Sequence, residues 1–352
     1  MKPITGAGAS VSRERAGQRA VVDVSGWPSE TVPYTDKARW HELRGRDVTS
    51  TQTAALFGLS PYNTAFEIAQ QKLAAIRGEF DRWAGNERTA WGNLLERVIA
   101  ERVGHVYGVQ VRPMKQYMRR TDAPMGASFD YEIIGVTDAR IDDERLRVLF
   151  GAHGVGVLEI KNVDARVFSS SWTTDGEPEA PEHIEIQVQH QLHVCGYGWA
   201  CIAALVGGNT LEIIPRLRDA EMGAALQARI EKFWLDLGAG ILPPIELPAD
   251  ADIIRKMHAY AEPGKLLDAR EDAEIAALCA EYAEAGNAAK VAEDRRKSAA
   301  AQLLQRIGDA ERVLVKGYTI SAGMVAPAHV EYERAGYRNL RITKKAAKAA
   351  AE

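Results

Sequence analysis

The most constraining feature of the sequence is a short apolar run, Gly156–Lys161, that ends in a carboxylate and an ammonium one residue apart. Successive side chains of a β-strand point to opposite faces of a sheet. In a strand, Glu159 and Lys161 therefore point the same way, while Leu158 and Ile160 enter the opposite layer. A carboxylate can hold a hard cation, and a neighbouring lysine can orient a water or stabilise a developing negative charge. Taken alone, such a pair is more often a salt bridge at a strand end, so a catalytic interpretation needs further residues.

Two upstream segments offer further carboxylates. Asp130 lies between small and aromatic residues in Gly126–Gly135, an unusual place for a charge that only faces solvent. Together with Glu159 it would form a two-carboxylate site suited to Mg²⁺ or Mn²⁺, because these ions take oxygen ligands and keep several waters. Glu96 lies in Trp91–Ile99, where apolar residues recur at helical spacing. It is either a third carboxylate of the site or a charge on a helix surface.

A glutamine-rich helix is predicted from about residue 181 to about residue 201. Gln187 and Gln191 share one side of it at four-residue spacing, with Gln189 elsewhere on the circumference. An amide both donates and accepts hydrogen bonds, so a glutamine beside a metal site can align the attacking water or hold the scissile phosphate. We predict catalytic roles for Gln187 and Gln189. A zinc site would instead use the histidines of this helix, which are His183, His190 and His193, but the carboxylates already account for the region.

A second polar site is predicted nearer the N-terminus, in a segment that resembles two short helices around a turn. The hydroxyls of Thr49–Thr51 precede a predicted helix over Gln52–Phe57 as capping groups. A helix N-terminus with free amides is suited to phosphate, and Arg44 and Arg46 stand just before it. The plainer interpretation is an ordinary helix cap with two solvated arginines.

Short strands and amphipathic helices alternate through the middle of the chain. Their pattern predicts a small, mostly antiparallel or mixed sheet, with a covering helix over Ala220–Leu237. The Trp199–Leu205 stretch reads as the end of the glutamine-rich helix. The predicted strands are Val109–Val111, Tyr131–Val136, Leu146–Phe150 and Val155–Ile160.

Three regions are predicted along the 352 residues. Residues 1–34 are rich in Gly, Ser, Arg and Pro and read as a flexible arm. Residues 35–247 form the main α/β domain. Residues 248–352 form a C-terminal helical region, with a long helix or helical hairpin over Asp268–Arg312, a hairpin over Val313–Val325 and a charged tail.

Composition is that of a soluble globular protein, 46% hydrophobic and 26% charged, with a net charge of −4. Mild acidity neither favours nor excludes DNA, because an enclosing nuclease needs only a local basic lining. The three cysteines form no metal or disulfide pattern, which favours a reducing compartment. No apolar run approaches membrane-spanning length, so no membrane association is predicted.

The order of these motifs resembles a known family. Glu96, Asp130, Glu159-Ile160-Lys161 and the glutamine-rich helix follow one another as in the PD-(D/E)xK nucleases, and within them the lambda-exonuclease and YqaJ-like phage recombination nucleases. The resemblance runs from about Trp40 to about Pro244. One departure is that Phe129-Asp130 replaces the Pro-Asp dipeptide of the superfamily name, which leaves the carboxylate in place.

The resemblance implies an α/β restriction-endonuclease-like core and a Mg²⁺-dependent 5′-to-3′ exonuclease acting on double-stranded DNA ends, with Mn²⁺ able to substitute. It implies that Asp130, Glu159 and the Ile160 carbonyl bind metal with Glu96 assisting. Lys161 would then position or deprotonate the water. By motif position, Arg44 and Thr51 would hold the 5′ phosphate of the DNA end, with threonine where serine is usual.

The resemblance also implies partners: a homo-oligomeric ring of three or four copies, and a phage single-strand annealing protein. A gene of phage or prophage origin and action in the bacterial cytoplasm are implied as well. Two other functions remain open. One is a structure-specific or restriction-like endonuclease, which would cut circular duplex; the other is a non-catalytic protein that binds DNA ends.

Overall fold

The computed structural model describes residues 27–33, 37–80, 86–141 and 143–329, together with residues 331, 338, 340 and 342. The chain divides into two compact units, Met1–Asp252 and Ile253–Glu352. The predicted boundary follows residue 247, and the buried Asp250 explains the difference. Its carboxylate accepts hydrogen bonds from the Thr64 hydroxyl (2.5 Å) and from the main-chain N–H of Glu246 (2.6 Å), which ties it to the first unit.

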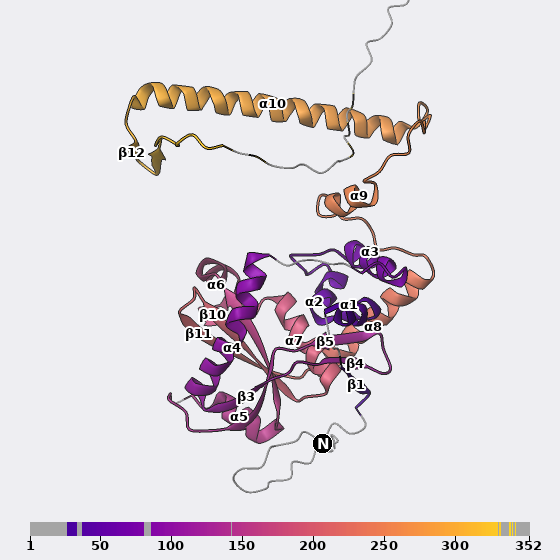
Figure 1. The fold of residues 1–352 in the computed structure, drawn as a ribbon, viewed down its shortest axis with the longest axis vertical. Helices are drawn as coiled ribbons and strands as arrows, with labels where there is room; N and C mark the ends of the chain where they lie inside the picture. The colour runs from indigo at the N-terminus through magenta and orange to yellow at the C-terminus, as the bar shows by residue number, and fades with distance from the viewer. Residues whose placement is uncertain are drawn as a thin grey trace, which may run out of the picture. The chain divides into compact units, whose positions relative to one another are not determined.

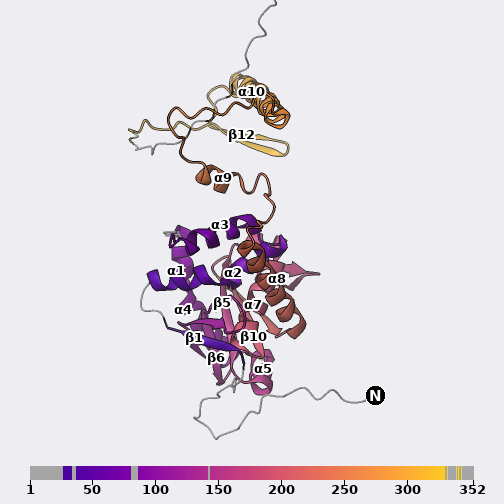
Figure 2. The ribbon, with the colours of Figure 1, turned by 90° about the vertical axis from the view of Figure 1, so that its right-hand side faces the viewer.

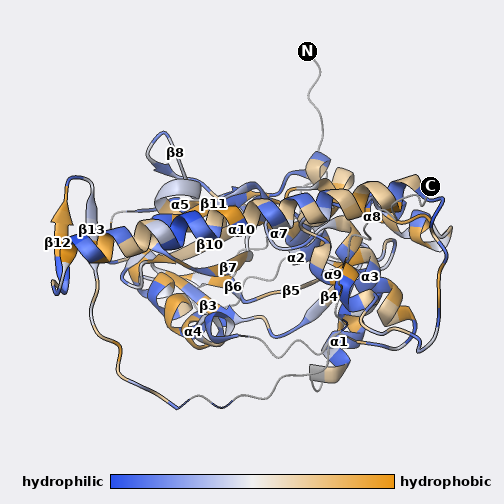
Figure 3. Cartoon of the chain, turned by 90° about the horizontal axis from the view of Figure 1, so that it is seen from above, coloured by the Kyte–Doolittle hydropathy of each residue, from blue (hydrophilic) through white to orange (hydrophobic). Residues whose placement is uncertain are grey.

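The larger sheet of the first unit consists of five strands, β3 (Val109–Pro113), β6 (Tyr131–Val136), β7 (Gly156–Val163), β10 (Trp199–Val206) and β11 (Thr210–Leu217). Their spatial order is β11-β10-β7-β6-β3 (Figure 3). Strands β7 and β10 are parallel, and the other neighbouring pairs are antiparallel. The sheet is therefore mixed, and with helices on its faces it confirms the predicted fold class.

Strand β7 lies at the centre of this sheet and separates two hydrophobic cores. Leu158 and Ile160 pack in a core with α4 (Glu87–Tyr107) and α5 (Arg145–His153). Val157 and Val163 belong to the other core, which includes α7 (Glu182–Cys195). Figures 1 and 2 show α4 and α7 on different sides of the strands. The period-two prediction is confirmed, because Glu159 and Lys161 share the face that carries α7.

The smaller sheet consists of four strands, β1 (Ser29–Val32), β2 (Val48–Thr49), β4 (Tyr117–Arg120) and β5 (Met125–Ser128). Their order is β1-β4-β5-β2. Four residues of the predicted flexible arm thus form an edge strand paired with β4, because main-chain hydrogen bonding to an existing strand needs no apolar periodicity. Residues 1–26 and 34 of the predicted arm lie outside the described residues.

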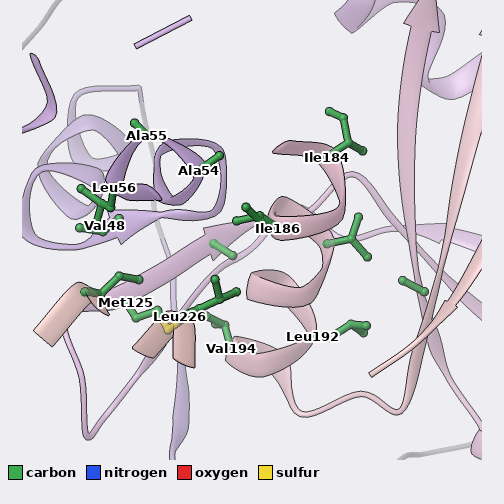
Figure 4. Packing of buried hydrophobic residues seen from close by; sticks show 14 of the residues in the cluster. Val48, Ala54, Ala55, Leu56, Met125, Ile184, Ile186, Leu192, Val194 and Leu226 are labelled. Carbon is green, nitrogen blue, oxygen red and sulfur yellow. The ribbon is translucent and has the colours of Figure 1, made fainter. Parts of the chain in front are cut away.

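Helix α7 connects the two sheets. It contacts β5 and β10 together with two helical elements, α2 (Ser50–Thr53) and α8 (Ala220–Gly238). Figure 4 shows Ile184, Leu192 and Val194 of this helix among the buried apolar side chains. The remaining elements of the unit are α1 (Lys37–Arg46), the 3₁₀ helix η1 (Ala54–Phe57), α3 (Ala65–Ile76), α6 (Ala165–Ser171), β8 (Thr173–Thr174) and β9 (Glu177–Pro178).

Two predicted elements have the wrong type. Leu146–Phe150 is part of helix α5, because Leu146, Leu149 and Phe150 lie at helical spacing and face one core. The Trp199–Leu205 stretch is strand β10 rather than a helix end. Gly196 has a positive φ of 77° and ends α7 after Cys195, and the apolar run that follows is typical of a strand buried on both faces.

The second unit contains α9 (Ala251–Met257), which crosses the boundary, α10 (Ala273–Ile307), β12 (Arg312–Val315) and β13 (Tyr318–Ser321). The antiparallel β12–β13 pair confirms the predicted hairpin. Helix α10 is one continuous helix without a buried residue, and it carries hydrophilic and hydrophobic residues along its whole length (Figure 3). Of the helices in the described part of the chain, none combines the length and apolar character needed to cross a bilayer.

Candidate active site

The candidate site is built on the middle of β7, just beyond the residues that pair with β6. Glu159 is buried, with 3% of its surface exposed, and its Oε1 atom accepts a hydrogen bond from the Lys161 Nζ atom at 2.5 Å. The two side chains point the same way because they are two residues apart in one strand. The Lys161 side chain remains 23% exposed, so one end of this ion pair reaches solvent and is open to a substrate.

Asp130 joins this pair from the adjoining strand. It follows β5 and precedes β6, where the chain passes from the smaller sheet to the larger one. Its Oδ2 atom accepts a hydrogen bond from the main-chain N–H of Ile160 at 2.9 Å. The ladder between β6 and β7 has ended at the Tyr131–Leu158 pair, so this N–H is available. The carbonyl of a strand residue points to the same side as its N–H, and therefore the Ile160 carbonyl points to the side of β7 on which Asp130 lies.

Two amides of α7 hold the buried carboxylate from the other side. Gln187 Nε2 donates to Glu159 Oε1 at 2.5 Å, and Gln191 Nε2 donates to Glu159 Oε2 at 2.7 Å. The same Gln191 nitrogen also donates to the Ser128 carbonyl at 3.2 Å. The Gln191 Oε1 atom is buried without a hydrogen-bond partner among the described residues. A buried acceptor without a donor is costly, so this atom fits a water or a ligand that enters the site.

Gln189 does not belong to the site, and its prediction as a catalytic residue is wrong. Its Nε2 atom donates to Glu185 and to the Leu217 carbonyl, and its Oε1 atom accepts from the Asp219 N–H that begins α8. The reason is helical geometry, because residues two apart lie on different sides of a helix. Gln191, which shares a side with Gln187, was visible by that spacing and takes the place predicted for Gln189.

Glu96 approaches the site from α4. It is partly buried, and burial raises its pKa, with a further increase from the Glu159 charge and opposing effects from Lys161 and Lys115. Within the described ranges, however, no three His, Cys, Asp or Glu side chains are arranged to hold a metal ion by themselves. Glu96 therefore acts on the other carboxylates through its charge, and its role as a direct ligand stays a prediction.

The closely spaced carboxylates of the site shift the pKa values of Asp130 and Lys161. Burial raises the pKa of Asp130 well above its usual range, and the nearby charge of Glu159 raises it further. Burial alone would lower the pKa of Lys161, but the charges of Glu159 and Asp130 outweigh it and raise that pKa. Lys161 is therefore an ammonium, which can donate a hydrogen bond and cannot accept a proton from water.

The donor set fits a hard divalent cation. Mg²⁺ is usually held by one or two carboxylates, several waters and substrate phosphates rather than by a complete protein cage. Asp130 and Glu159 supply two carboxylates, Ile160 supplies a carbonyl, and the partnerless oxygen of Gln191 can accept a hydrogen bond from a bound water. A cation would also relieve the repulsion that raises the pKa of Asp130.

The second predicted site lies in α1, β2 and α2, where the structure shows a buried basic cluster formed by Arg44 and Lys72. The Lys72 ammonium donates to the carbonyls of Arg44 (2.8 Å) and Asp47 (2.6 Å) and to Gln52 Oε1 (2.8 Å). These acceptors are neutral. Burial, with a contribution from the Arg44 charge, lowers the pKa of Lys72 to about 7. The nearby Asp47 carboxylate, which is paired with Arg119, opposes this decrease only in part.

Arg44 and Thr51 both lie in this segment, as predicted. The Arg44 guanidinium lies 4.4 Å from the centre of the Trp40 ring, and the Thr51 hydroxyl lies 3.3 Å from that of Thr49. The predicted helix over Gln52–Phe57 is instead one turn of α2 followed by η1. A helix this short gives little dipole, so phosphate binding here depends on the side chains. Binding of a 5′ phosphate by Arg44 and Thr51 stays a prediction.

The three histidines of α7 lie in separate surroundings. His183 packs edge-on against Tyr62, and His193 is bonded to Gln227 at 2.9 Å. His190 lies between the Thr53 hydroxyl (2.7 Å) and the Gly126 carbonyl (3.0 Å), and burial lowers its pKa to about 3. His190 is therefore a neutral structural residue that joins α7 to α2 and β5.

Residues 39–198 match the family model described as the YqaJ-like viral recombinase domain. The match confirms the family resemblance and covers every predicted site residue. No curated protein sequence matches the chain.

Several solved structures are similar to the chain, and three of them are exonucleases. The alkaline exonuclease LHK-Exo from Laribacter hongkongensis has 16% identity and a TM-score of 0.39, over 62% of this chain and 97% of the other. Its complex with dAMP has 17% identity and a TM-score of 0.39, over 57% and 93%. A phage-related exonuclease from Haemophilus somnus 129PT has 12% identity and a TM-score of 0.32, over 55% and 96%.

Proposed function

We propose that this protein is a metal-dependent 5′-to-3′ exonuclease that degrades one strand of double-stranded DNA from its ends. The product would be 3′ single-stranded overhangs for phage-type homologous recombination. The family match over residues 39–198 supports a nuclease. The observation that carries the proposal is the arrangement on β7, where Glu159 is bound by Lys161 and two glutamines while Asp130 binds the adjoining N–H.

Asp130, Glu159 and the Ile160 carbonyl would hold Mg²⁺, with Glu96 assisting and with Mn²⁺ able to substitute. The bound ion would supply charge stabilisation at the phosphate and a more acidic water. The residues around the site orient the metal-binding carboxylate. Gln187 and Gln191 fix the Glu159 carboxylate in one rotamer, so that its oxygens are already in place when DNA arrives.

Lys161 would donate a hydrogen bond to the attacking water or to a non-bridging oxygen of the scissile phosphate. Its raised pKa supports this positioning role over proton removal, because an ammonium has no lone pair to accept the proton. Glu96, whose pKa is also raised, is the nearby carboxylate suited to receive a proton. Water attack in line with the leaving oxygen would then release a mononucleotide.

The basic cluster would bind the 5′ phosphate of the duplex end, with Arg44 and Thr51 as its direct contacts. The lowered pKa of Lys72 supports this assignment, because a dianionic phosphate nearby would stabilise the ammonium form. The working form would be a homo-oligomeric ring of three or four copies, acting with a phage single-strand annealing protein in the bacterial cytoplasm.

Digestion of linear duplex labelled at either end, with and without Mg²⁺, tests this function. Mononucleotides should appear from the 5′-labelled end first, and only with the metal. A circular duplex without ends should remain intact. Cleavage of the circle would identify an endonuclease, and binding of ends without any Mg²⁺-dependent release would identify a non-catalytic protein.

A further inference from the structure

An exposed tyrosine packs against the helix that carries the glutamines of the candidate active site. Tyr62 is 75% exposed, in the turn between η1 and α3. Its ring packs edge-on against His183, with 5.7 Å between ring centres and an interplanar angle of 82°. A large aromatic side chain that remains this exposed is available to a ligand.

The position of Tyr62 relative to the catalytic residues follows from α7. His183, Gln187 and Gln191 are spaced by four residues and share one side of this helix. Gln187 and Gln191 contact Glu159, and His183 stands one turn further out. Burial lowers the pKa of His183 and the Lys161 charge lowers it further, so His183 lies within electrostatic reach of Lys161. The Tyr62 ring is therefore next to the site that would hold the scissile phosphate.

The turn that carries Tyr62 is held in one conformation. The Ser60 hydroxyl accepts hydrogen bonds from the main-chain N–H groups of Tyr62 and Asn63, both at 3.2 Å. The Asn63 amide donates to Glu67 of α3 at 3.1 Å. Such local bonds fix a turn, so little conformational entropy is lost when a ligand contacts the ring.

We propose that Tyr62, supported by His183, is a nucleobase-stacking site for the nucleotide that adjoins the scissile phosphate. This inference rests on the proposed function. A DNA strand entering the site presents its phosphate to Lys161 and its base to the neighbouring surface, and every base offers a flat face that an aromatic ring can stack on. Stacking of this kind tolerates any sequence, as an exonuclease requires. His183 is a positioning residue, because its edge contact orients the Tyr62 ring.

The test is binding of duplex ends in a metal chelator, followed by fluorescence anisotropy, for the wild type and for Tyr62→Ala and Tyr62→Phe. Each is measured on intact DNA and on DNA with an abasic nucleotide moved through the first three positions. Stacking predicts that Tyr62→Ala weakens binding of intact DNA by about tenfold. Tyr62→Phe should bind like the wild type. At one position the abasic nucleotide should weaken wild-type binding by the same factor, and Tyr62→Ala should add nothing there.

Leu235→Ala in α8 is the matched control, because Leu235 is 74% exposed, and it should bind all substrates normally. If Tyr62→Ala weakens intact and abasic DNA equally at every position, or if Tyr62→Phe behaves like Tyr62→Ala, no base stacks on the ring and the inference fails. The proposed function fails separately, when the wild type releases no nucleotides with Mg²⁺. A wild type that cuts DNA while Tyr62→Ala binds normally overturns the stacking site alone.

Discussion

The acidic site on β7 and the basic cluster around Lys72 both bury charged groups, but the groups have opposite sign. In the acidic site, three carboxylates share one ammonium, and the pKa of Asp130 is raised by burial and by Glu159. In the basic cluster, Lys72 is buried with neutral acceptors beside the partly buried Arg44, and the pKa of Lys72 is lowered to about 7 although the Asp47 charge opposes the decrease. In both regions the nearby opposite charge does not offset the cost of burial. A bound cation would relieve this cost in the first region, and a bound anion would relieve it in the second.

The largest expected effect is the loss of the central carboxylate of the acidic site. Glu159→Gln should lower Mg²⁺-dependent DNA cleavage on the order of a thousandfold, because a neutral amide is a poor ligand for a hard cation. Mn²⁺ binding, measured by calorimetry, should weaken in parallel. The control is Glu132→Gln, since Glu132 is equally buried on the adjacent strand and bonded to Arg112 and Tyr197. Normal cleavage by Glu159→Gln would show that the acidic site does not bind the catalytic metal.

The next effect concerns the amides that hold this carboxylate. Gln191→Leu should reduce Mn²⁺ affinity and cleavage by about 10- to 100-fold, as expected when a residue that orients a metal ligand is lost. Gln189→Leu is the matched control, because Gln189 is buried on the same helix and bonds to Glu185 and the start of α8. It should lower thermal stability and leave metal affinity unchanged. Equal losses of metal affinity in both variants would mean that α7 stability, rather than carboxylate orientation, is measured.

Lys72 of the basic cluster should make the free energy of unfolding depend on pH. The folded pKa of Lys72 is about 7 and the ordinary value is 10.5, so the unfolded chain binds more protons between these limits. The free energy of unfolding should therefore rise with pH across this window, by up to about 1.4 kcal/mol per pH unit.

Lys72→Met should remove this rise, measured as the difference between wild-type and variant urea unfolding curves at each pH. Lys232→Met, at an exposed lysine paired with Asp236, should keep it. A difference that falls as pH increases would contradict the assignment of Lys72 as a strained buried cation.

The smallest effect is expected for recognition of the DNA end. Arg44→Gln should reduce the preference for a 5′-phosphate over a 5′-hydroxyl end by about tenfold, because one charge-assisted hydrogen bond is lost. Arg46→Gln is the control on the same helix, since Arg46 is exposed and paired with Glu42. The ratio of initial rates on the two substrates is the measurement. An unchanged ratio for Arg44→Gln would place the phosphate contact elsewhere.

Much of the core arrangement could be predicted from periodicity alone. The alternation in β7 assigned Glu159 and Lys161 to one face and Leu158 to the other, and the structure confirms both. The errors came where a local pattern suits two states. Leu146–Phe150 is apolar enough for a strand, yet the spacing of Leu146, Leu149 and Phe150 indicated the observed helix.

Residue positions in the site could be predicted where one helix or strand determines them. They could not be predicted where residues from several elements meet. Four-residue spacing on α7 places Gln191 on the same side as Gln187. Gln189, two residues from Gln187, lies on a different side of the helix. The buried charge of Lys72 left no such signal, because its acceptors are main-chain carbonyls from a segment 25 to 28 residues away. Tertiary folding, not local sequence, brings these groups together.

Strand β5 sets the separation between the proposed 5′-phosphate site and the candidate active site. Its Gly126 pairs with Thr49, next to the proposed 5′-phosphate site, and its chain continues to Asp130 of the candidate active site. The four residue steps from Gly126 to Asp130 span about 13 Å when extended. Inserting or deleting one residue in this short stretch would change the separation by about 3.3 Å and reverse the side chains that follow. If the two candidate sites act as proposed, these few residues set the length of DNA strand between the bound 5′ phosphate and the cleaved bond.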